Sequence, residues 1–167
     1  MNATEFLLPA VVIGVGATAV MDLWGIVQKR FLGMQPLNYC LLGRWIGHFP
    51  RGRFVHDNIA HASRVRGECP LGWSAHYAIG ITFAALLLLR WGSGWARNPS
   101  VAPALVVGIG TVVAPFFLLQ PGMGAGIAAS KTPRPNVARL RSLATHTVFG
   151  LGLYVAGWCW AFLSRHV

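Results

Sequence analysis

Four side chains that could carry chemistry lie inside otherwise apolar stretches of the chain. They are a carboxylate, two imidazoles and a carboxamide: Asp22, His76, His146 and Gln120. One carboxylate and two imidazoles match a ligand set for zinc, iron or manganese, so a metal ion held by Asp22, His76 and His146 is one hypothesis. Haem ligation by the two histidines is a second. A protonated imidazole beside a carboxylate could instead form a proton relay or a cation site.

The same side chains could also have a purely structural role. A hydrogen-bonded polar network can fix the register in which membrane helices pack and do nothing else. Ionisable groups inside a membrane more often have a function, because they are costly to bury there. Both interpretations stay open at this point.

The elements that must position these side chains are four apolar stretches. Of the 167 residues, 54% are hydrophobic and 11% are charged, and the mean hydropathy is +0.54. This leaves too few polar side chains to cover a soluble globule. The stretches long enough to cross a bilayer are residues 6–27, 71–89, 101–120 and 143–163. We therefore predict an all-α, polytopic membrane protein, a single four-helix domain over residues 1–167 with connections at 28–70 and 121–142.

The polar side chains are expected to face protein rather than lipid. Small residues at steps of four precede Asp22, and similar stripes carry His76 and His146. Such stripes let helix backbones approach each other in a membrane. Gln120 lies at the end of its own stretch, where Pro121 should end the helix. Counted from the nearest charged residues at 1.5 Å per residue, the ionisable groups lie about 8 to 12 Å deep, so all four should converge in one layer.

The basic residues predict how the chain crosses the membrane. Eleven of the fourteen Lys and Arg residues lie in the connections 28–70 and 121–142. An excess of Lys and Arg marks cytoplasmic loops. We therefore expect a bacterial inner-membrane protein whose large basic loops are cytoplasmic and whose termini are both periplasmic.

The expected partners follow from the same distribution of charge. A net charge of +10 could suggest nucleic acid, but the cations occupy connections rather than one face of a soluble domain, so we predict no nucleic-acid partner. The lipid bilayer is the first partner. Because four helices enclose little room, a homodimer or a larger membrane complex is the second.

The two basic connections contain the candidate contacts to lipid or to another anion. The stretch "LNYCLLGRWIGHF", residues 37–49, has apolar side chains at helical spacing and predicts an amphipathic helix in the cytoplasmic interface. Arg44, Arg51 and Arg53 are expected to meet lipid phosphates. In "QPGMGAGIAASKTPRP", residues 120–135, backbone N–H groups and Lys131 could hold an anion or a head group, although an ordinary loop is the alternative.

The three cysteines predict no cross-link. Cys40, Cys69 and Cys159 follow neither a metal-binding nor a disulfide spacing. The first two fall in a connection assigned to the cytoplasm, where thiols are kept reduced. We therefore expect free thiols.

Five segments taken together resemble a known family. They are "GATAVMDLW", "LGRWIGHFPRGRF", "LGWSAHYAIGITFA", "QPGMGAG" and "ATHTVFGLGLY". In this order they are similar to a family of small bacterial inner-membrane proteins that is catalogued as a domain of unknown function. The resemblance covers nearly the whole chain and implies four spans in a bacterial membrane. It implies no substrate, reaction or ligand residue.

Three classes of function stay open. The first is a transporter or ion-conducting protein in which Asp22 and the histidines bind a proton, a cation or a small ligand. The second is a membrane-embedded enzyme with a metal ion or haem, acting on a lipid or a quinone. The third is an accessory subunit of a membrane complex. The polar layer slightly favours binding linked to transport over catalysis.

Overall fold

The fold is all-α. The computed structural model describes residues 3–165, and this part of the chain contains no strand. Four helices are long and apolar enough to span a membrane, Glu5–Leu32, Glu68–Arg97, Val101–Met123 and Pro135–Leu163. The predicted fold class with its four apolar helices is thereby confirmed.

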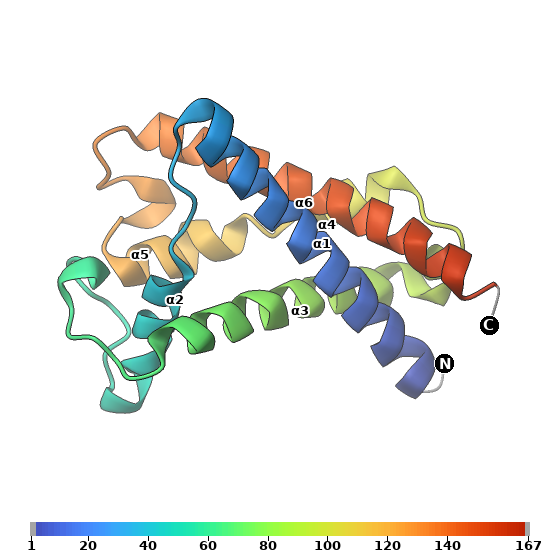
Figure 1. Ribbon diagram of the computed structural model, residues 1–167, viewed down its shortest axis with the longest axis horizontal. Helices are drawn as coiled ribbons and strands as arrows, with labels where there is room; N and C mark the ends of the chain where they lie inside the picture. The colour runs from blue at the N-terminus through green and yellow to red at the C-terminus, as the bar shows by residue number, and fades with distance from the viewer. Residues whose placement is uncertain (1–2, 166–167) are drawn as a thin grey trace. The chain divides into compact units, whose positions relative to one another are not determined.

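The elements follow one another in a simple order (Figure 1). The α-helices are α1 (Ala3–Leu32), α2 (Tyr39–Gly47), α3 (Glu68–Arg97), α4 (Val101–Gly110), α5 (Gln120–Met123) and α6 (Pro135–Leu163). The shorter turns are η1 (Phe49–Arg51), η2 (Ile59–His61), the π-helical η3 (Pro115–Leu119) and η4 (Ile127–Ala129). The chain forms two compact units. Unit 1 contains Met1–Pro36, Tyr77–Thr111 and Thr145–Val167, and unit 2 contains Leu37–His76 and Val112–Ala144.

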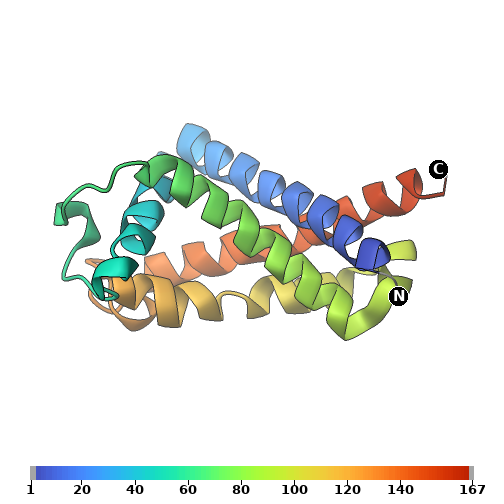
Figure 2. The ribbon, with the colours of Figure 1, turned by 90° about the horizontal axis from the view of Figure 1, so that it is seen from below.

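Unit 1 is built from α1, α4 and the later parts of α3 and α6. Its core consists of apolar side chains that these four segments bury together, among them Ile13, Ala17, Leu87, Leu88, Phe149 and Leu153. The start of α1 and the end of α6 lie at the same end of this unit (Figures 1 and 2). That arrangement is the one expected for an even number of spans.

Small residues bring the helices of unit 1 into close contact. A Cβ atom added to Gly14 of α1 would collide with the backbone of α3, and one added to Gly80 of α3 would collide with the hydroxyl of Thr18. In the same way, α4 and α6 touch at Gly108 and Gly150. The stripes of small residues are therefore packing faces, as predicted for helices that associate in a membrane.

Unit 2 is organised by a close crossing of α2 with the first turns of α3. The two helices touch at Gly43 and Gly72, where a Cβ atom on either residue would collide with the backbone of the other helix. Asn38 caps α2 by accepting a hydrogen bond from the Cys40 backbone N–H at 3.0 Å. The helix predicted in this connection is therefore present.

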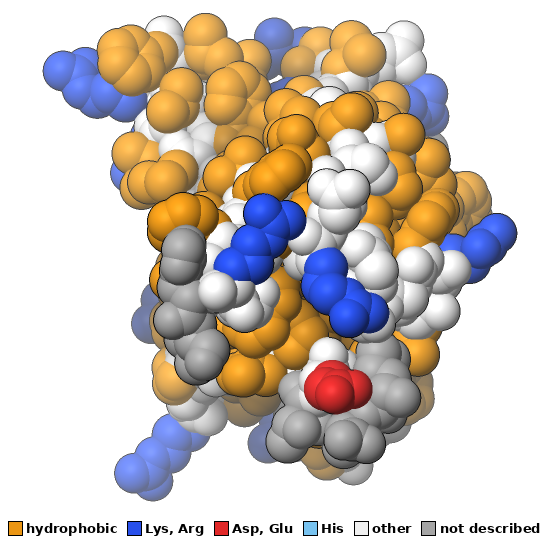
Figure 3. All heavy atoms as spheres, turned by 90° about the vertical axis from the view of Figure 1, so that its right-hand side faces the viewer, with side chains coloured by type: hydrophobic (Ala, Val, Ile, Leu, Met, Phe, Trp, Pro, Cys, Tyr) orange, Lys and Arg blue, Asp and Glu red, His pale blue; other side chains and the backbone are white. Residues whose placement is uncertain are grey.

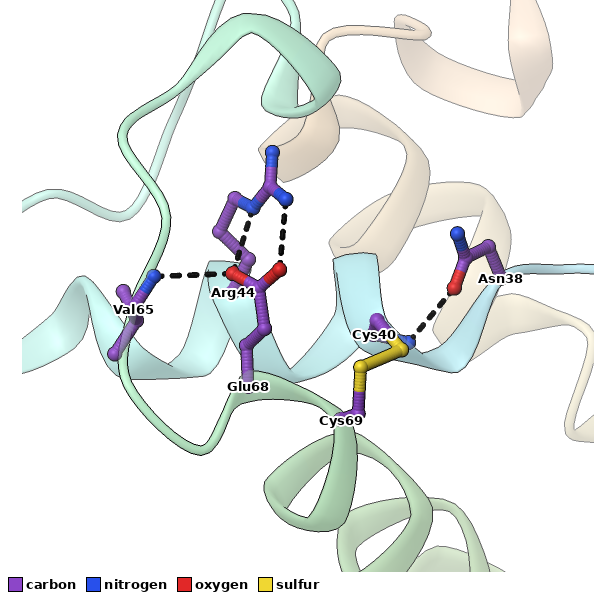
Figure 4. The surroundings of a disulfide bond; sticks show 6 residues. All are labelled: Asn38, Cys40, Arg44, Val65, Glu68 and Cys69. Atoms are coloured by element: carbon purple, nitrogen blue, oxygen red, sulfur yellow. Dashed lines mark hydrogen bonds and ion pairs between the residues drawn. A yellow bond between two sulfur atoms is a disulfide. The ribbon is translucent and has the colours of Figure 1, made fainter.

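Cys40 and Cys69 form a disulfide beside this crossing (Figure 4). The expectation of three free thiols is therefore wrong for these two residues, and only Cys159 is free. The half-cystines are 29 positions apart, and it is the tertiary contact of α2 with α3 that brings them together. No local spacing could have indicated this pairing.

The end of the third span differs from the prediction. The third span does not end at Pro121, because the π-helical turn η3 leads directly into α5 and Pro121 lies in its first turn. Proline has no N–H to donate, and the π-helical turn before it accommodates this loss, so that the helix continues past residue 121. Gly124, with φ 96°, ends α5 in the left-handed conformation that glycine adopts readily.

Hydrophobic side chains cover much of the face of the molecule that Figure 3 shows. Large exposed apolar residues occur on all four spans, including Leu23, Ile26, Leu89, Val106, Leu118 and Phe162. Soluble proteins rarely expose such continuous apolar surface, whereas lipid-facing helices must.

Candidate functional site in the spanning helices

Asp22 is held by a tyrosine in unit 1. The hydroxyl of Tyr77 on α3 donates a hydrogen bond to Oδ2 of Asp22 on α1 over 3.0 Å, and both side chains are half-buried. One turn earlier on α1, the hydroxyl of Thr18 donates to the carbonyl of Gly14 over 2.7 Å. Asp22 thus faces a neighbouring helix, as its stripe of small residues predicted.

His146 on α6 contacts α4 within the same unit. Its Nδ1 lies 3.0 Å from the hydroxyl of Thr111 and 3.3 Å from the carbonyl of Gly108. The Thr111 hydroxyl itself donates to the Gly108 carbonyl over 2.7 Å. A carbonyl can only accept, so this arrangement favours the tautomer that carries its proton on Nδ1. Nε2 is then the nitrogen that could bind a proton or a ligand.

His76 belongs to unit 2 and lies among aromatic rings. It is 7% exposed, and its imidazole stacks on Tyr39 of α2 with ring centroids 3.9 Å apart. Trp73, one turn earlier on α3, contacts Tyr39 edge-on at 4.7 Å. The histidine therefore helps to hold α2 against α3.

Gln120 is a polar side chain of unit 2 with only one of its two amide atoms paired. Its Nε2 donates to the hydroxyl of Ser142 on α6 over 3.3 Å. Its Oε1 is buried and accepts no hydrogen bond from any residue in the described range 3–165. This oxygen could accept a hydrogen bond from a ligand or a water molecule.

The four predicted site residues are divided between the two units. Asp22 and His146 lie in unit 1, and His76 and Gln120 lie in unit 2. Each contacts a partner on another helix of its own unit, so all four face protein. Their convergence in one layer stays a prediction.

The predicted metal set receives no support from the structure. Within residues 3–165, no group of three or more His, Cys, Asp or Glu side chains is arranged to hold a metal ion. Asp22 and His146 belong to unit 1 and His76 to unit 2. A metal ion on these three residues and haem ligation by the two histidines therefore stay predictions.

Arg44 does not face lipid as predicted. Its guanidinium is buried and makes a bidentate ion pair with Glu68, with Nε and Nη2 at 2.9 and 2.7 Å from the carboxylate oxygens (Figure 4). Nη1 also points at the backbone carbonyls of residues 59, 60 and 62. The hydrogen bond to Glu68 raises the pKa of Arg44. The reason for the wrong prediction is that α2 packs on α3 rather than lying alone in the interface.

The other predicted lipid or anion contacts are exposed. Arg51, Arg53 and Lys131 all lie on the surface of unit 2 and stay predictions. The glycine-rich segment near Lys131 is folded on itself, since the backbone N–H groups of residues 125, 129, 130 and 131 donate to carbonyls between residues 120 and 127. Those four donors are therefore not available to an anion.

A comparison with protein families identifies the group to which the chain belongs. The model of a family described as "Protein of unknown function (DUF2938)" matches residues 11–160. The chain belongs to this family. No curated protein and no solved structure matches the chain. Membership of DUF2938 confirms the resemblance and adds no activity to it.

The hydrogen-bond partners of the polar residues in this DUF2938 protein are Tyr77, Thr111 and Ser142. The sequence did not single out Tyr77, although it directly follows His76, which was expected to face protein. Thr111 and Ser142 lie on the stripes of small residues in the third and fourth spans, which mark them as packing positions but not as partners of His146 and Gln120.

Proposed function

We propose that this protein binds a proton or a small cation at Asp22 within the bacterial inner membrane and that this binding is linked to transport. The observation that carries the proposal is the hydrogen bond from Tyr77 to Asp22. A carboxylate inside an apolar span is costly and marks ion pathways and proton relays in membrane proteins. The neutral phenol orients the carboxylate without adding a charge, which suits a group that takes up and releases a cation.

The surroundings of Asp22 support the same role. The hydroxyl of Thr18 donates its hydrogen bond to the carbonyl of Gly14 within α1. It therefore does not donate to the carboxylate of Asp22. Asp22 is half-buried rather than enclosed in the core. A cation can reach this half-buried carboxylate more readily than it could reach a fully buried position, such as that of Ile13 two and a half turns earlier on α1.

Proton uptake into liposomes tests the proposal. We would reconstitute the protein with a pH-sensitive dye inside, acidify the outside and follow the internal pH. The wild type should acidify the interior faster than protein-free liposomes, and Asp22→Asn should remove the difference. Glu5→Gln is the matched control, because it neutralises an exposed carboxylate on the same helix. Equal uptake by Asp22→Asn and the wild type would contradict the proposal.

We further propose that the two basic connections face the cytoplasm and that both termini face the periplasm. The distribution of Lys and Arg supports this orientation, whereas the disulfide in the first connection counts against it, because cytoplasmic thiols are kept reduced. The contact of α2 with α3 does not depend on the disulfide alone, since Gly43, Gly72 and the ion pair of Arg44 hold it too. The charges therefore favour a cytoplasmic connection, in which we expect the cysteine pair to cycle between dithiol and disulfide.

Reporter fusions at the C-terminus decide the orientation. Alkaline phosphatase folds only in the oxidising periplasm, whereas green fluorescent protein exported in unfolded form does not fluoresce there. We expect an active phosphatase fusion and a dark fluorescent fusion. The opposite pair of results would place the disulfide-bonded connection in the periplasm.

A homodimer is the proposed working form. In the span Val101–Met123, 17% of the most apolar 18-residue stretch is buried, against 33 to 39% in the other three spans. Its free surface suits contact with lipid or with a second copy. Cross-linking in lipid, compared with the mass of the purified protein in detergent, distinguishes a dimer from a monomer.

A further inference from the structure

Two histidines outside the spans lie side by side in unit 2. His48 follows α2, and His56 lies between η1 and η2. Their ring centroids are 5.0 Å apart and the rings are inclined by 62°. His48 is only 1% exposed. The backbone N–H of His56 donates to the carbonyl of Gly122 over 2.9 Å, which fixes the segment that carries this residue.

The hydrogen bond of His48 defines which of its nitrogens is free. Nε2 lies 3.0 Å from the carbonyl oxygen of Ser63. Because a carbonyl only accepts, Nε2 carries the proton, and Nδ1 of the neutral ring presents a lone pair. Metal-bound histidines are oriented in the same way, by donating one ring N–H to a carbonyl and binding the metal through the other nitrogen.

The remaining ring nitrogens of this pair are buried without partners. Nδ1 of His48 and both ring nitrogens of His56 have no hydrogen bond to any residue that the structure describes. Three such atoms on two adjacent rings are unusual, because buried polar atoms are nearly always paired. A ligand between the rings would satisfy at least one nitrogen of each.

We propose that His48 and His56 together bind a transition-metal cation of the zinc or copper class. Imidazole nitrogen is a preferred ligand of both metals. Two imidazoles on one tetrahedral ion, each with a metal–nitrogen distance of about 2.0–2.1 Å, have ring centres roughly 5 Å apart. The observed spacing of 5.0 Å matches this geometry.

The surroundings indicate an exchangeable site. Within residues 3–165, no group of three His, Cys, Asp or Glu side chains is arranged to hold a metal ion. The other coordination positions of an ion bound by His48 and His56 would therefore be filled by water or by an outside ligand. A pocket of about 380 Å³ lies beside His56 and is also lined by Arg53, Asp57 and His61. Asp57 contributes a carboxylate to this lining and Arg53 a guanidinium. The pocket gives an ion a route to His56.

Zinc binding by the full-length protein, with its purification tag removed, tests this site. Calorimetry in detergent should show about one Zn²⁺ per chain. His56→Asn should weaken binding more than ten-fold, because one of two protein ligands is lost. His61→Asn is the matched control, since His61 lines the same pocket outside the pair. Absence of binding by the wild type, or equal losses in the two variants, would overturn the proposal.

The spectrum of bound Cu²⁺ supplies a second measurement. Electron paramagnetic resonance should show two nitrogen ligands in the wild type and in His61→Asn, and one in His56→Asn. An unchanged number of nitrogens in His56→Asn would show that the ion binds elsewhere. His56 is the residue to replace, because His48 is buried and its loss could unfold unit 2.

Discussion

The hydroxyl of Tyr77 on α3 lies 3.0 Å from Oδ2 of Asp22 on α1 and donates a hydrogen bond to it. This contact joins two spans whose backbones touch at Gly14 and Gly80, two turns of α1 before Asp22. The close crossing fixes the distance between the helices, and the hydrogen bond fixes the direction of the carboxylate. The geometry of the proposed cation site therefore depends on residues that bind no cation.

Removal of the Tyr77 hydroxyl should slow proton uptake rather than abolish it. A hydrogen bond to a charged group contributes about 1.5–3 kcal/mol, and without it the carboxylate of Asp22 is no longer held in one direction. In Tyr77→Phe the rate of proton uptake should therefore fall below that of the wild type and stay above that of Asp22→Asn. Tyr154→Phe, which removes a hydroxyl from α6, is the control and should leave the rate unchanged. An unchanged rate in Tyr77→Phe would show that the hydroxyl does not orient the site.

Gly14→Ala should separate α1 from α3. The added Cβ would meet the backbone of Ile81, which cannot rotate away. Overpacking of this kind costs about 1–3 kcal/mol, and thermal unfolding in detergent should show a lower midpoint together with slower proton uptake. At Gly94 a Cβ would meet nothing within 4 Å, so Gly94→Ala should be neutral or slightly stabilising. Similar losses at both positions would mean that the crossing is not tight.

Arg44→Met should destabilise the protein by about 3 kcal/mol, because it leaves Glu68 mostly buried without its ion-pair partner. The two side chains are only 8% and 13% exposed. Adding Glu68→Met to Arg44→Met should recover part of the loss, since an uncompensated charge is removed. Arg51→Met, at an exposed position, should change the free energy of unfolding by less than about 0.5 kcal/mol. Denaturant unfolding in detergent measures all four proteins.

Reduction of the disulfide should lower stability without dismantling unit 2. A cross-link that closes a loop of 29 residues contributes about 3–4 kcal/mol in the chain-entropy description. The double variant Cys40→Ser with Cys69→Ser should therefore unfold at a lower temperature than the wild type. A reducing agent should lower the unfolding temperature of the wild type and leave that of the double variant unchanged. Cys159→Ser is the control, because this thiol is free. A wild type that is insensitive to the reducing agent would contradict a disulfide at this position.

The sequence predicted the spans well because hydropathy and length are enough to define a helix in lipid. It also predicted which face of α1 is packed, since only small residues allow the approach seen at Gly14. The end of the third span was harder. Pro121 stops an ordinary helix, but the π-helical turn before it lets the chain continue to Met123.

The contacts between distant segments were beyond the reach of spacing rules. Arg44 looked like a lipid contact because its partner Glu68 lies far along the chain. Cys40 and Cys69 looked unpaired for the same reason. The pair of His48 and His56 follows no helical period, because a turn separates the two residues, and only the folded connection brings their rings together.

Infrared difference spectroscopy of the protein in lipid tests the central claim most directly, because it detects the protonation of single carboxyl groups. Between high and low pH, the wild type and Glu5→Gln should both gain the band of a protonated carboxylic acid in an apolar environment. The account predicts that Asp22→Asn lacks this band. A difference spectrum of Asp22→Asn identical to that of the wild type would show that Asp22 does not bind the proton.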